Sequence, residues 1–226
     1  MPGHFHFICD SLQKDKVTFG EAEARHISGV LRYTIGDEIS FTNGKGTSGK
    51  ASITGISKKS VEAQVLSQKL NERSKSLTLA IGILRQSDRM EWLVEKCTEF
   101  GVEKIIFISS DNAQKSKVNL DRMNKKAFAA VKQSHGSFLP SIETQKFSDA
   151  IALKENKFIA YCTDGTNKLQ VVDLPSQANV FIGPEGDFSE REIKLAEEMG
   201  AKPLELGTNV LRAETAAILT CGVHYL

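Results

Sequence analysis

Two glycine-bearing turns near the carboxyl end of the chain carry the residue types best suited to chemistry. The first, Gly183-Pro184-Glu185-Gly186, follows the apolar run 179–182, and the second, Gly207-Thr208-Asn209, follows the run 202–206. Each turn leads into a stretch with helical spacing, so free backbone N–H groups stand at the start of a helix. Such turns can grip a nucleoside or a carboxylate, although purely structural turns between a strand and a helix have the same composition.

Arg212 and Glu214 are the charged residues that open the last helical stretch, which the spacing predicts to begin at 210–215. A cation near a helix N-terminus is unfavourable because the helix dipole is positive there. Arg212 therefore needs a partner. Either it pairs with Glu185 or Glu214 as part of the packing, or it faces a ligand, and the residue types alone leave both alternatives open.

The elements that must position these turns alternate between strands and helices from residue 77 onward. Near-continuous apolar runs are typical of strands buried on both faces, and their alternation with helical spacing predicts a parallel α/β sheet. Ligands bind such sheets at the carboxyl edge, where both turns lie. The predicted strands are 77–84, 105–108, 158–162, 180–182 and 202–206. The predicted helices are 119–133, the closing helix, and two that start with capping boxes, Asp88 with Glu91 (ending at Gly101) and Ser189 with Glu192.

The first part of the chain has the pattern of a small all-β domain. Five segments alternate apolar and polar residues, the period of half-buried strands, and Gly-rich turns separate them: 5–7, 17–19, 39–41, 51–53 and 61–65. One helical segment, 21–31, interrupts them. Short strands at this spacing suggest a small barrel. We therefore predict a β-barrel domain at 1–70, a polar linker at 71–76 and an α/β domain at 77–226.

Composition and missing motifs exclude several classes of protein. The 226 residues carry a net charge of +1, which does not by itself indicate a nucleic-acid binder. The four cysteines lie far apart, so no metal site is expected. The chain contains no phosphate-binding P-loop, no dinucleotide fingerprint and no nucleophile elbow. It has no run of eighteen apolar residues and no secretory signal pattern, so a cytoplasmic protein is expected.

Five segments of the sequence resemble motifs of one enzyme family. IGPEGDFSEREI and LGTNVLRAETAA resemble the two signature motifs of the RsmE family of SPOUT methyltransferases. Three further segments resemble other motifs of that family in the same order: HISGVLRYTIGDEI, DRMEWLVEKCTEFGVEKI and KQSHGSFLP. The resemblance covers essentially the whole chain. Five motifs in order are far more specific than any single one.

The resemblance implies a fold, a reaction and partners. The first domain would be a PUA-like RNA-binding barrel, and the second a SPOUT domain with a parallel sheet and a trefoil knot. The enzyme would transfer a methyl group from S-adenosyl-L-methionine to N3 of a specific uridine in small-subunit (16S) ribosomal RNA, with the assembled subunit as the expected substrate. It would act as a homodimer in the cytoplasm, without a metal. Two alternatives remain: a non-catalytic RNA-binding protein with the same fold, and an α/β enzyme that binds a phosphorylated small molecule.

The resemblance also implies roles for individual residues. The donor would lie among three loops, held by Thr163, Ile182, Gly183, Pro184, Gly186, Leu206, Gly207, Val210, Leu211, Thr215 and Ala216. The glycines would be required because a side chain would collide with the ligand. Arg212 would stabilise the negative charge that uracil gains on losing its N3 proton, and Glu185 or Glu214 would orient Arg212 or remove that proton.

The predicted RNA contacts are basic residues in both domains. The candidates for phosphate binding are Arg25, Arg32, Lys115 and Lys117, with Lys45 and Lys50 as further candidates. Outside the two signature motifs the chain departs from the family pattern. The departures are at Gln86-Ser87, Lys132, Gly136 and Asn112, and they concern RNA contacts rather than donor binding.

Overall fold

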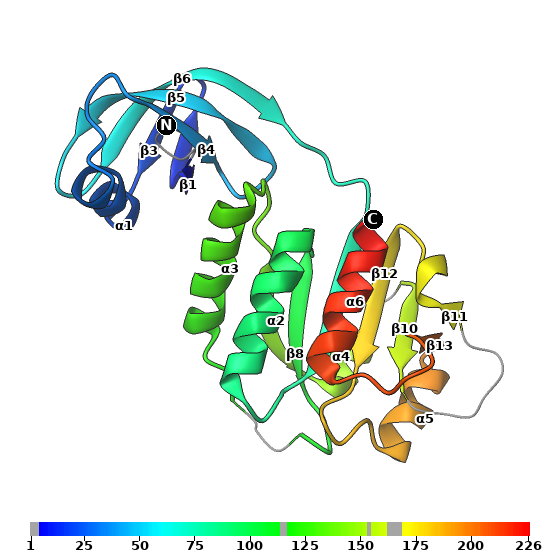
Figure 1. The fold of residues 1–226 in the computed structure, drawn as a ribbon. Helices are drawn as coiled ribbons and strands as arrows, with labels where there is room; N and C mark the ends of the chain where they lie inside the picture. Colours follow the sequence, from blue (N-terminus) through cyan, green and yellow to red (C-terminus); the bar gives the residue numbers. More distant parts are fainter. Residues whose placement is uncertain (1–4, 114–116, 153–154, 162–168) are drawn as a thin grey trace. The chain divides into compact units, whose positions relative to one another are not determined.

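A computed structural model describes residues 5–113, 117–152, 155–161 and 169–226. The chain forms two compact units, one of Met1–Glu72 with Phe128–Leu139 and the other of Arg73–Ala127 with Pro140–Leu226 (Figure 1). Helix α3 (Leu120–Ser134) begins in the second unit and ends in the first. The domain boundaries at 1–70, 71–76 and 77–226 stay a prediction. The structure groups a further segment, Phe128–Leu139, with the first unit.

The first unit is a curled six-stranded sheet in the order β1-β4-β5-β6-β3-β2. Among the described strands, β1 pairs with β4 in parallel, and the other pairs are antiparallel. All five predicted strands are confirmed, and β2 was missed. Alternate residues point inward, so that Phe7, Phe19 and Phe41 fill the core. The strands are β1 (His6–Ile8), β2 (Ser11–Gln13), β3 (Lys16–Phe19), β4 (Glu38–Thr42), β5 (Thr47–Ile56) and β6 (Val61–Leu70).

The helical segment predicted at 21–31 is present but not uniform. It begins as α1 (Glu21–Ala24) and widens into a π-helix, η1 (Arg25–Val30). The amide of Leu31 accordingly donates to the carbonyl of His26, five residues back, at 3.0 Å. Ile27 on this segment is fully buried, and its packing holds the wider turn against the sheet.

The second unit is a seven-stranded, all-parallel sheet in the order β11-β13-β10-β12-β7-β8-β9. The predicted parallel α/β sheet is thus confirmed, whereas β9, β11 and the short helix α4 were missed. The trefoil knot stays a prediction. The strands are β7 (Ser76–Gly82), β8 (Lys104–Ser109), β9 (Ser141–Lys146), β10 (Lys157–Ala160), β11 (Leu169–Gln170), β12 (Gln177–Ile182) and β13 (Lys202–Glu205).

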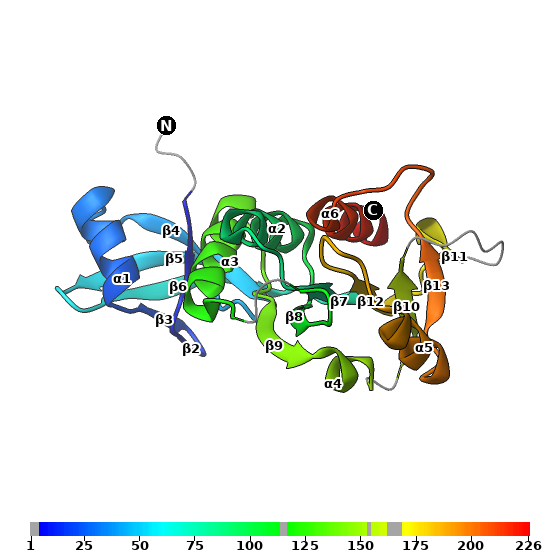
Figure 2. The same cartoon turned by 90° about the horizontal axis from the view of Figure 1, so that it is seen from below.

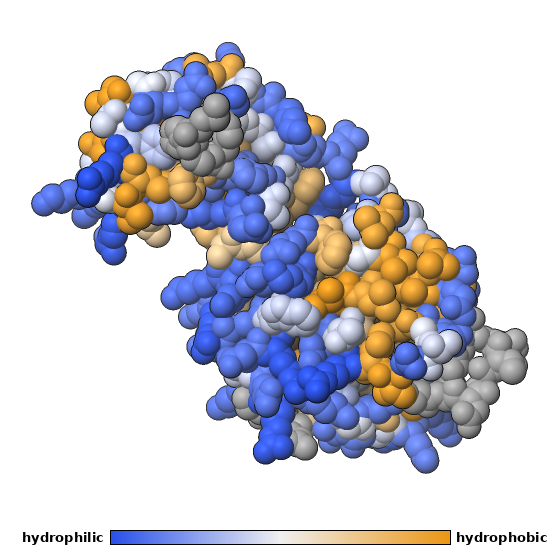
Figure 3. Space-filling view, in the orientation of Figure 1, coloured by the Kyte–Doolittle hydropathy of each residue, from blue (hydrophilic) through white to orange (hydrophobic). Residues whose placement is uncertain are grey.

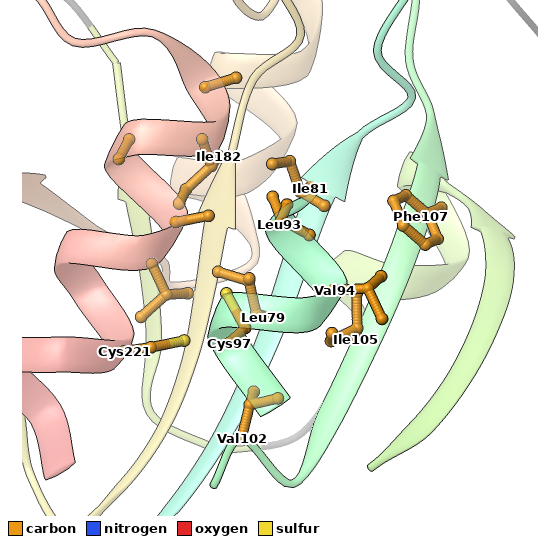
Figure 4. Close-up of a cluster of buried hydrophobic side chains, with 14 of the residues drawn as sticks. Leu79, Ile81, Leu93, Val94, Cys97, Val102, Ile105, Phe107, Ile182 and Cys221 are labelled. Atoms are coloured by element: carbon orange, nitrogen blue, oxygen red, sulfur yellow. The ribbon is translucent and has the colours of Figure 1, made fainter. Parts of the chain in front are cut away.

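Helices cover both faces of this sheet. Helices α2 (Ser87–Phe100) and α6 (Ala213–Tyr225) lie on one face, and α4 (Phe147–Ile151) and α5 (Glu190–Glu198) lie on the other (Figure 2). A short 3₁₀ turn, η2 (Val171–Asp173), precedes β12. The larger core packs α2 and α6 on the strands, with Cys97 of α2 and Cys221 of α6 fully buried in it (Figure 4). No helix among the described residues is long and apolar enough to cross a membrane.

The two predicted capping boxes have different outcomes. Ser189 and Glu192 form the reciprocal pair at the start of α5, as predicted. The pair at Asp88 and Glu91 is wrong: α2 has Gln86 as its N-cap, without a side-chain cap. Glu91 instead faces α3, where its carboxylate lies 2.6 Å from Nε of Arg122. Glu91 thus forms an ion pair with a residue of another helix instead of the local hydrogen bond of a capping box. The predicted stop at Gly101 is confirmed by its left-handed conformation.

His6 makes the stability of the first unit depend on pH. Its ring is buried 5.4 Å from that of His135, and its Nε2 atom has no partner among the described residues. Burial first, and then the charge of His135, lower the pKa of His6 to about 4, while a hydrogen bond to the Gly136 backbone opposes the shift. The unfolded chain therefore takes up this proton near pH 6.5, before the folded chain does.

We accordingly expect the free energy of unfolding to be highest above about pH 6.5 and to fall toward pH 4. One proton corresponds to about 1.4 kcal/mol per pH unit. Urea unfolding between pH 7.5 and 5 measures this slope, and His6→Gln should reduce it by about one proton. An unchanged slope in His6→Gln would show that other groups set the pH dependence.

Candidate active site at the carboxyl edge of the parallel sheet

The parallel sheet brings both glycine-bearing turns to one edge. Strand β10 lies between β12 and β13, so the loops that follow β12 and β13 leave the sheet on either side of the end of β10. Thr163, in the loop that follows β10, lies outside the described residues. The structure therefore places two of the three predicted donor loops at the same edge of the sheet, on either side of β10.

The turn after β12 folds tightly on itself. Gly183 and Pro184 are buried, whereas Glu185 and Gly186 are exposed. The amide of Asp187 closes the turn on the carbonyl of Pro184 at 3.0 Å. A Cβ atom on Gly183 would lie 3.0 Å from Oδ1 of Asp187 and 3.1 Å from its backbone. The protein itself thus requires glycine at 183, which the sequence attributed only to collision with a ligand.

Asn112, in the loop after β8, holds this turn from outside. Its side-chain amide donates to the carbonyls of Gly186 at 3.0 Å and Asp187 at 3.2 Å. A Cβ atom on Gly186 would lie only 3.1 Å from Cβ of Asn112, so glycine lets the two loops approach. The sequence assigned the change at Asn112 to RNA contacts. The structure instead shows that Asn112 positions the turn predicted to bind the donor.

Asp111 strengthens the same attachment. Its carboxylate accepts hydrogen bonds from Arg191 at 2.6 Å and from the hydroxyl of Ser189 at 2.7 Å. Both donors lie at the start of α5, directly after the turn. The bond from Arg191, followed by that from Ser189, lowers the pKa of Asp111 below its usual value. Local periodicity gives no signal for such a contact, because residues 111 and 191 are far apart in sequence.

Gly82 is a third glycine that the site needs and that sequence reasoning missed. It ends β7, the neighbour of β12, and a Cβ atom there would collide with the backbone of Pro184. The buried backbone of 183–184 can therefore lie against β7 only because residue 82 has no side chain. A glycine at the last position of an otherwise apolar strand was the available signal.

The segment after β13 combines apolar side chains with backbone N–H groups, which together can bind a nucleoside. Gly207 has φ of 137°, a conformation that favours glycine. Leu206 and Leu211 are half-buried, whereas Val210 is 84% exposed. Within the described residues, no backbone N–H from 207 to 211 donates to another backbone carbonyl. A ligand with an apolar and a hydrogen-bonding edge would meet both kinds of surface here. Ile182 ends β12, and Thr215 and Ala216 lie in the first turn of α6.

Arg212 is exposed at the N-cap of α6 in an extended conformation. The helix begins at Ala213, three residues later than the pattern predicts, so Arg212 precedes the helix rather than lying inside it. No carboxylate of the described residues forms an ion pair with its guanidinium. The packing alternative, in which Arg212 pairs with Glu185 or Glu214, is therefore not what this part of the structure shows.

The two predicted carboxylates differ in partner and in exposure. Glu185 is exposed and accepts a hydrogen bond from the backbone N–H of Arg85 at 3.1 Å. The Glu214 side chain is only 6% exposed, and its Oε1 lies 3.6 Å from Nε of Arg89 on α2. A ligand can thus contact Glu185 directly, whereas the buried Glu214 can affect a ligand only through another residue.

The predicted RNA contacts are dispersed over both units. In the first unit Arg25 is exposed and pairs with Glu21 at 2.9 Å, and Arg32 is exposed with φ of 59°. Lys45 and Lys50 are also exposed. Lys117, before α3, is exposed in the second unit, whereas Lys115 lies outside the described residues. These five described cations remain candidates for phosphate contacts.

Comparisons with known proteins cover both units. The profile of an RNA methyltransferase domain matches residues 71–225, and that of an RNA methyltransferase PUA domain matches residues 19–66. The ribosomal RNA small subunit methyltransferase E of Rickettsia conorii is 30% identical over 201 residues, which cover 85% of this chain and 82% of the relative.

Solved structures agree with these matches along the chain. A probable rRNA methyltransferase from Porphyromonas gingivalis is 31% identical, with a TM-score of 0.83, over 96% of this chain and 94% of the other. The ribosomal RNA small subunit methyltransferase E of Neisseria gonorrhoeae, solved with bound S-adenosyl methionine, is 28% identical, with a TM-score of 0.82 and the same coverage. This chain therefore belongs to the RsmE family of RNA methyltransferases, with a PUA-like unit before its SPOUT-type domain.

Proposed function

We propose that this protein transfers the methyl group of S-adenosyl-L-methionine to N3 of a specific uridine in small-subunit (16S) ribosomal RNA. Family membership supports the class of reaction, and the donor is bound in related structures from Neisseria gonorrhoeae and Legionella pneumophila. The observation that carries the proposal is Arg212, an exposed cation without an ion-pair partner among the described residues, which follows the second of two turns that suit a nucleoside.

The chemistry of uracil methylation explains why an exposed guanidinium lies at the carboxyl edge of the sheet. Uracil N3 carries a proton, and its loss leaves negative charge that is shared by O2 and O4. Arg212 binds that charge more strongly in the transition state than in the ground state, which is the condition for catalysis. Glu185 takes the proton, because it is the accessible one of the two carboxylates. The Arg85 amide holds its carboxylate in place.

The donor, when bound, supplies an electrophilic methyl group on a sulfonium. N3 forms the new N–C bond as the S–C bond breaks, so a neutral thioether leaves and the proton of N3 remains on Glu185. The turns around Gly183, Gly186 and Gly207 orient the reactants through their backbone groups, which converts the encounter into a step within one complex. No residue needs to form a covalent bond with the substrate.

The RNA would extend over more than the target nucleotide. Exposed cations occur in both units, Arg25, Arg32, Lys45 and Lys50 in the first and Lys117 in the second. A folded RNA presents phosphates to such dispersed cations, whereas a short strand does not. We therefore extend the proposal to the assembled small subunit as substrate, which would place the enzyme with ribosomes in the cytoplasm.

A second copy of the chain is the partner that the surface of α6 fits. Over its 13 residues the acidic and basic side chains are Glu214 and His224, and both are buried. The outer positions are partly exposed and almost entirely uncharged: Thr215, Ile218, Leu219, Gly222 and Val223. Figure 3 shows hydrophobic residues gathered over α6 and the segment that leads into it. A helix apolar on both faces is typical of burial on both sides, which a homodimer provides.

Arg212→Ala should abolish most of the methyl transfer while the donor still binds. The loss of one such charge-stabilising group lowers the rate by about 10²- to 10³-fold. Transfer of labelled methyl to small subunits lacking the modification measures activity, and calorimetry measures donor affinity. Lys194→Ala, an exposed cation on α5, serves as control. Full activity in Arg212→Ala would remove this residue from the mechanism, and donor binding without any transfer by the wild type would favour a non-catalytic RNA-binding protein.

Asn112→Ala should weaken donor binding, because the turn at 183–187 loses two hydrogen bonds that fix it. The expected loss is roughly fivefold in affinity, which corresponds to about 1 kcal/mol. Calorimetry with S-adenosylmethionine measures it. The matched control is Asn124→Ala, since the Asn124 amide donates only to its own helix, at the Leu120 carbonyl. Equal affinities in both variants would mean that the turn does not need Asn112.

Leu219→Glu should convert the dimer into monomers, since it places a charge at a partly exposed apolar position of α6. Light scattering after size-exclusion chromatography measures the mass in solution. Leu66→Glu is the control, because Leu66 is 52% exposed on β6, away from α6 in sequence and sheet. A wild-type monomer at micromolar concentration would contradict the homodimer.

A further inference from the structure

A buried ion pair between α2 and α6 has no role in the function described so far. Nε of Arg89, in the first turn of α2, lies 3.6 Å from Oε1 of Glu214, in the first turn of α6. The Glu214 side chain is 6% exposed, and its other oxygen, Oε2, is buried without a hydrogen-bond partner among the described residues. The Arg89 side chain is 29% exposed, so its guanidinium reaches the surface.

This arrangement stabilises the fold less than an apolar pair of the same volume would. A buried carboxylate oxygen without a partner costs about 1–3 kcal/mol, and a buried ion pair seldom regains its desolvation penalty. The N-terminus of α6 favours the charge of Glu214, but the N-terminus of α2 disfavours the charge of Arg89. Packing therefore does not account for Arg89, and a requirement for an oriented cation does.

The position of the pair indicates what that cation serves. Glu214 lies two residues after Arg212, so Arg89 approaches the start of α6 within one helical turn of Arg212. At its other side, α2 follows Arg85, whose amide binds Glu185. Arg89 thus lies on α2. This helix follows Arg85, which binds Glu185, and its ion pair reaches the start of α6, directly after Arg212.

We propose that Arg89 is a second substrate-binding cation, and that Glu214 is the positioning residue that orients it. The inference rests on the proposed N3 methylation. The charge of deprotonated uracil is shared by O2 and O4, which flank N3 on opposite sides, while N3 itself must stay open to the methyl group. One guanidinium beside N3 serves one of these oxygens. Arg89 binds the other with its Nη groups, because Nε faces Glu214.

The test compares Arg89→Lys, Arg89→Ala and Glu214→Gln with Arg122→Ala. Arg122 is a suitable control, since it also pairs with a buried carboxylate, that of Glu91, at 2.6 Å. We expect kcat to fall about 10²-fold in Arg89→Ala and about tenfold in Glu214→Gln, with KM for RNA and donor affinity within about threefold of wild type. Arg122→Ala should retain the wild-type kcat, and Arg89→Lys, which keeps the charge without the fork, should recover part of the loss.

The pH profile separates substrate binding from a structural role. The single-turnover rate rises with pH as N3 loses its proton, and weaker stabilisation of the anion moves this rise to higher pH. The rise should shift upward in Arg89→Ala and Glu214→Gln at unchanged melting temperature. A wild-type profile and kcat in Arg89→Lys and Arg89→Ala would overturn the proposal, as would a change in KM alone, which indicates a phosphate contact. If the wild type methylates no uridine N3, the proposed function itself fails, which the same assay detects separately.

Discussion

The parallel pairing of β7 with β12 is the constraint on which the site in the second unit depends. The two strands align over six consecutive residue pairs, from Ser76 with Gln177 to Ile81 with Ile182, although about a hundred residues separate them in the chain. This register brings the end of β7 beside the turn after β12, and the absence of a side chain at Gly82 allows Pro184 to lie there. The start of α2 then faces the same turn, so that the Arg85 amide meets Glu185. Residues from two distant segments become neighbours through one strand pair.

The charged side chains around this edge of the parallel sheet are not all paired, and this difference matters for the chemistry. Glu91 binds Arg122, Asp111 binds Arg191, and Glu214 is paired with Arg89. Each carboxylate in this set has its own cation within the described part of the chain. Arg212 alone among these arginines lacks one there, and it stands at a helix N-cap where the dipole opposes its charge. An anion bound at Arg212 therefore meets a cation that no described carboxylate neutralises, and the binding energy is available for the transition state.

The sequence predicted what local patterns determine, and it failed where a distant partner decides. Ser189 and Glu192 satisfy each other within one turn, so their capping box was predictable. Asp88 and Glu91 have the same spacing, but Arg122 on another helix takes the carboxylate of Glu91. The strands β9 and β11 were missed because β9 is largely polar at the sheet edge and β11 has two residues. Likewise, Asn112 could not be assigned to the donor turn, since its partners lie more than seventy residues away. The motifs predict where the site lies, and the fold shows which distant residues hold the two turns in place.

The segment from Leu206 to Arg212 concentrates the features that a folded chain ordinarily avoids. Val210 is 84% exposed, Gly207 adopts a conformation rare for other residues, and the amides of 207–211 donate to no backbone carbonyl among the described residues. Each feature costs stability, because apolar surface and backbone groups prefer burial with partners. Their occurrence together, directly before α6, marks a segment that the described part of the chain leaves open to a ligand. A donor with an apolar edge, an anionic base and a second subunit would be complementary to these three features, so the proposed cofactor, substrate and dimer contacts all depend on this one segment.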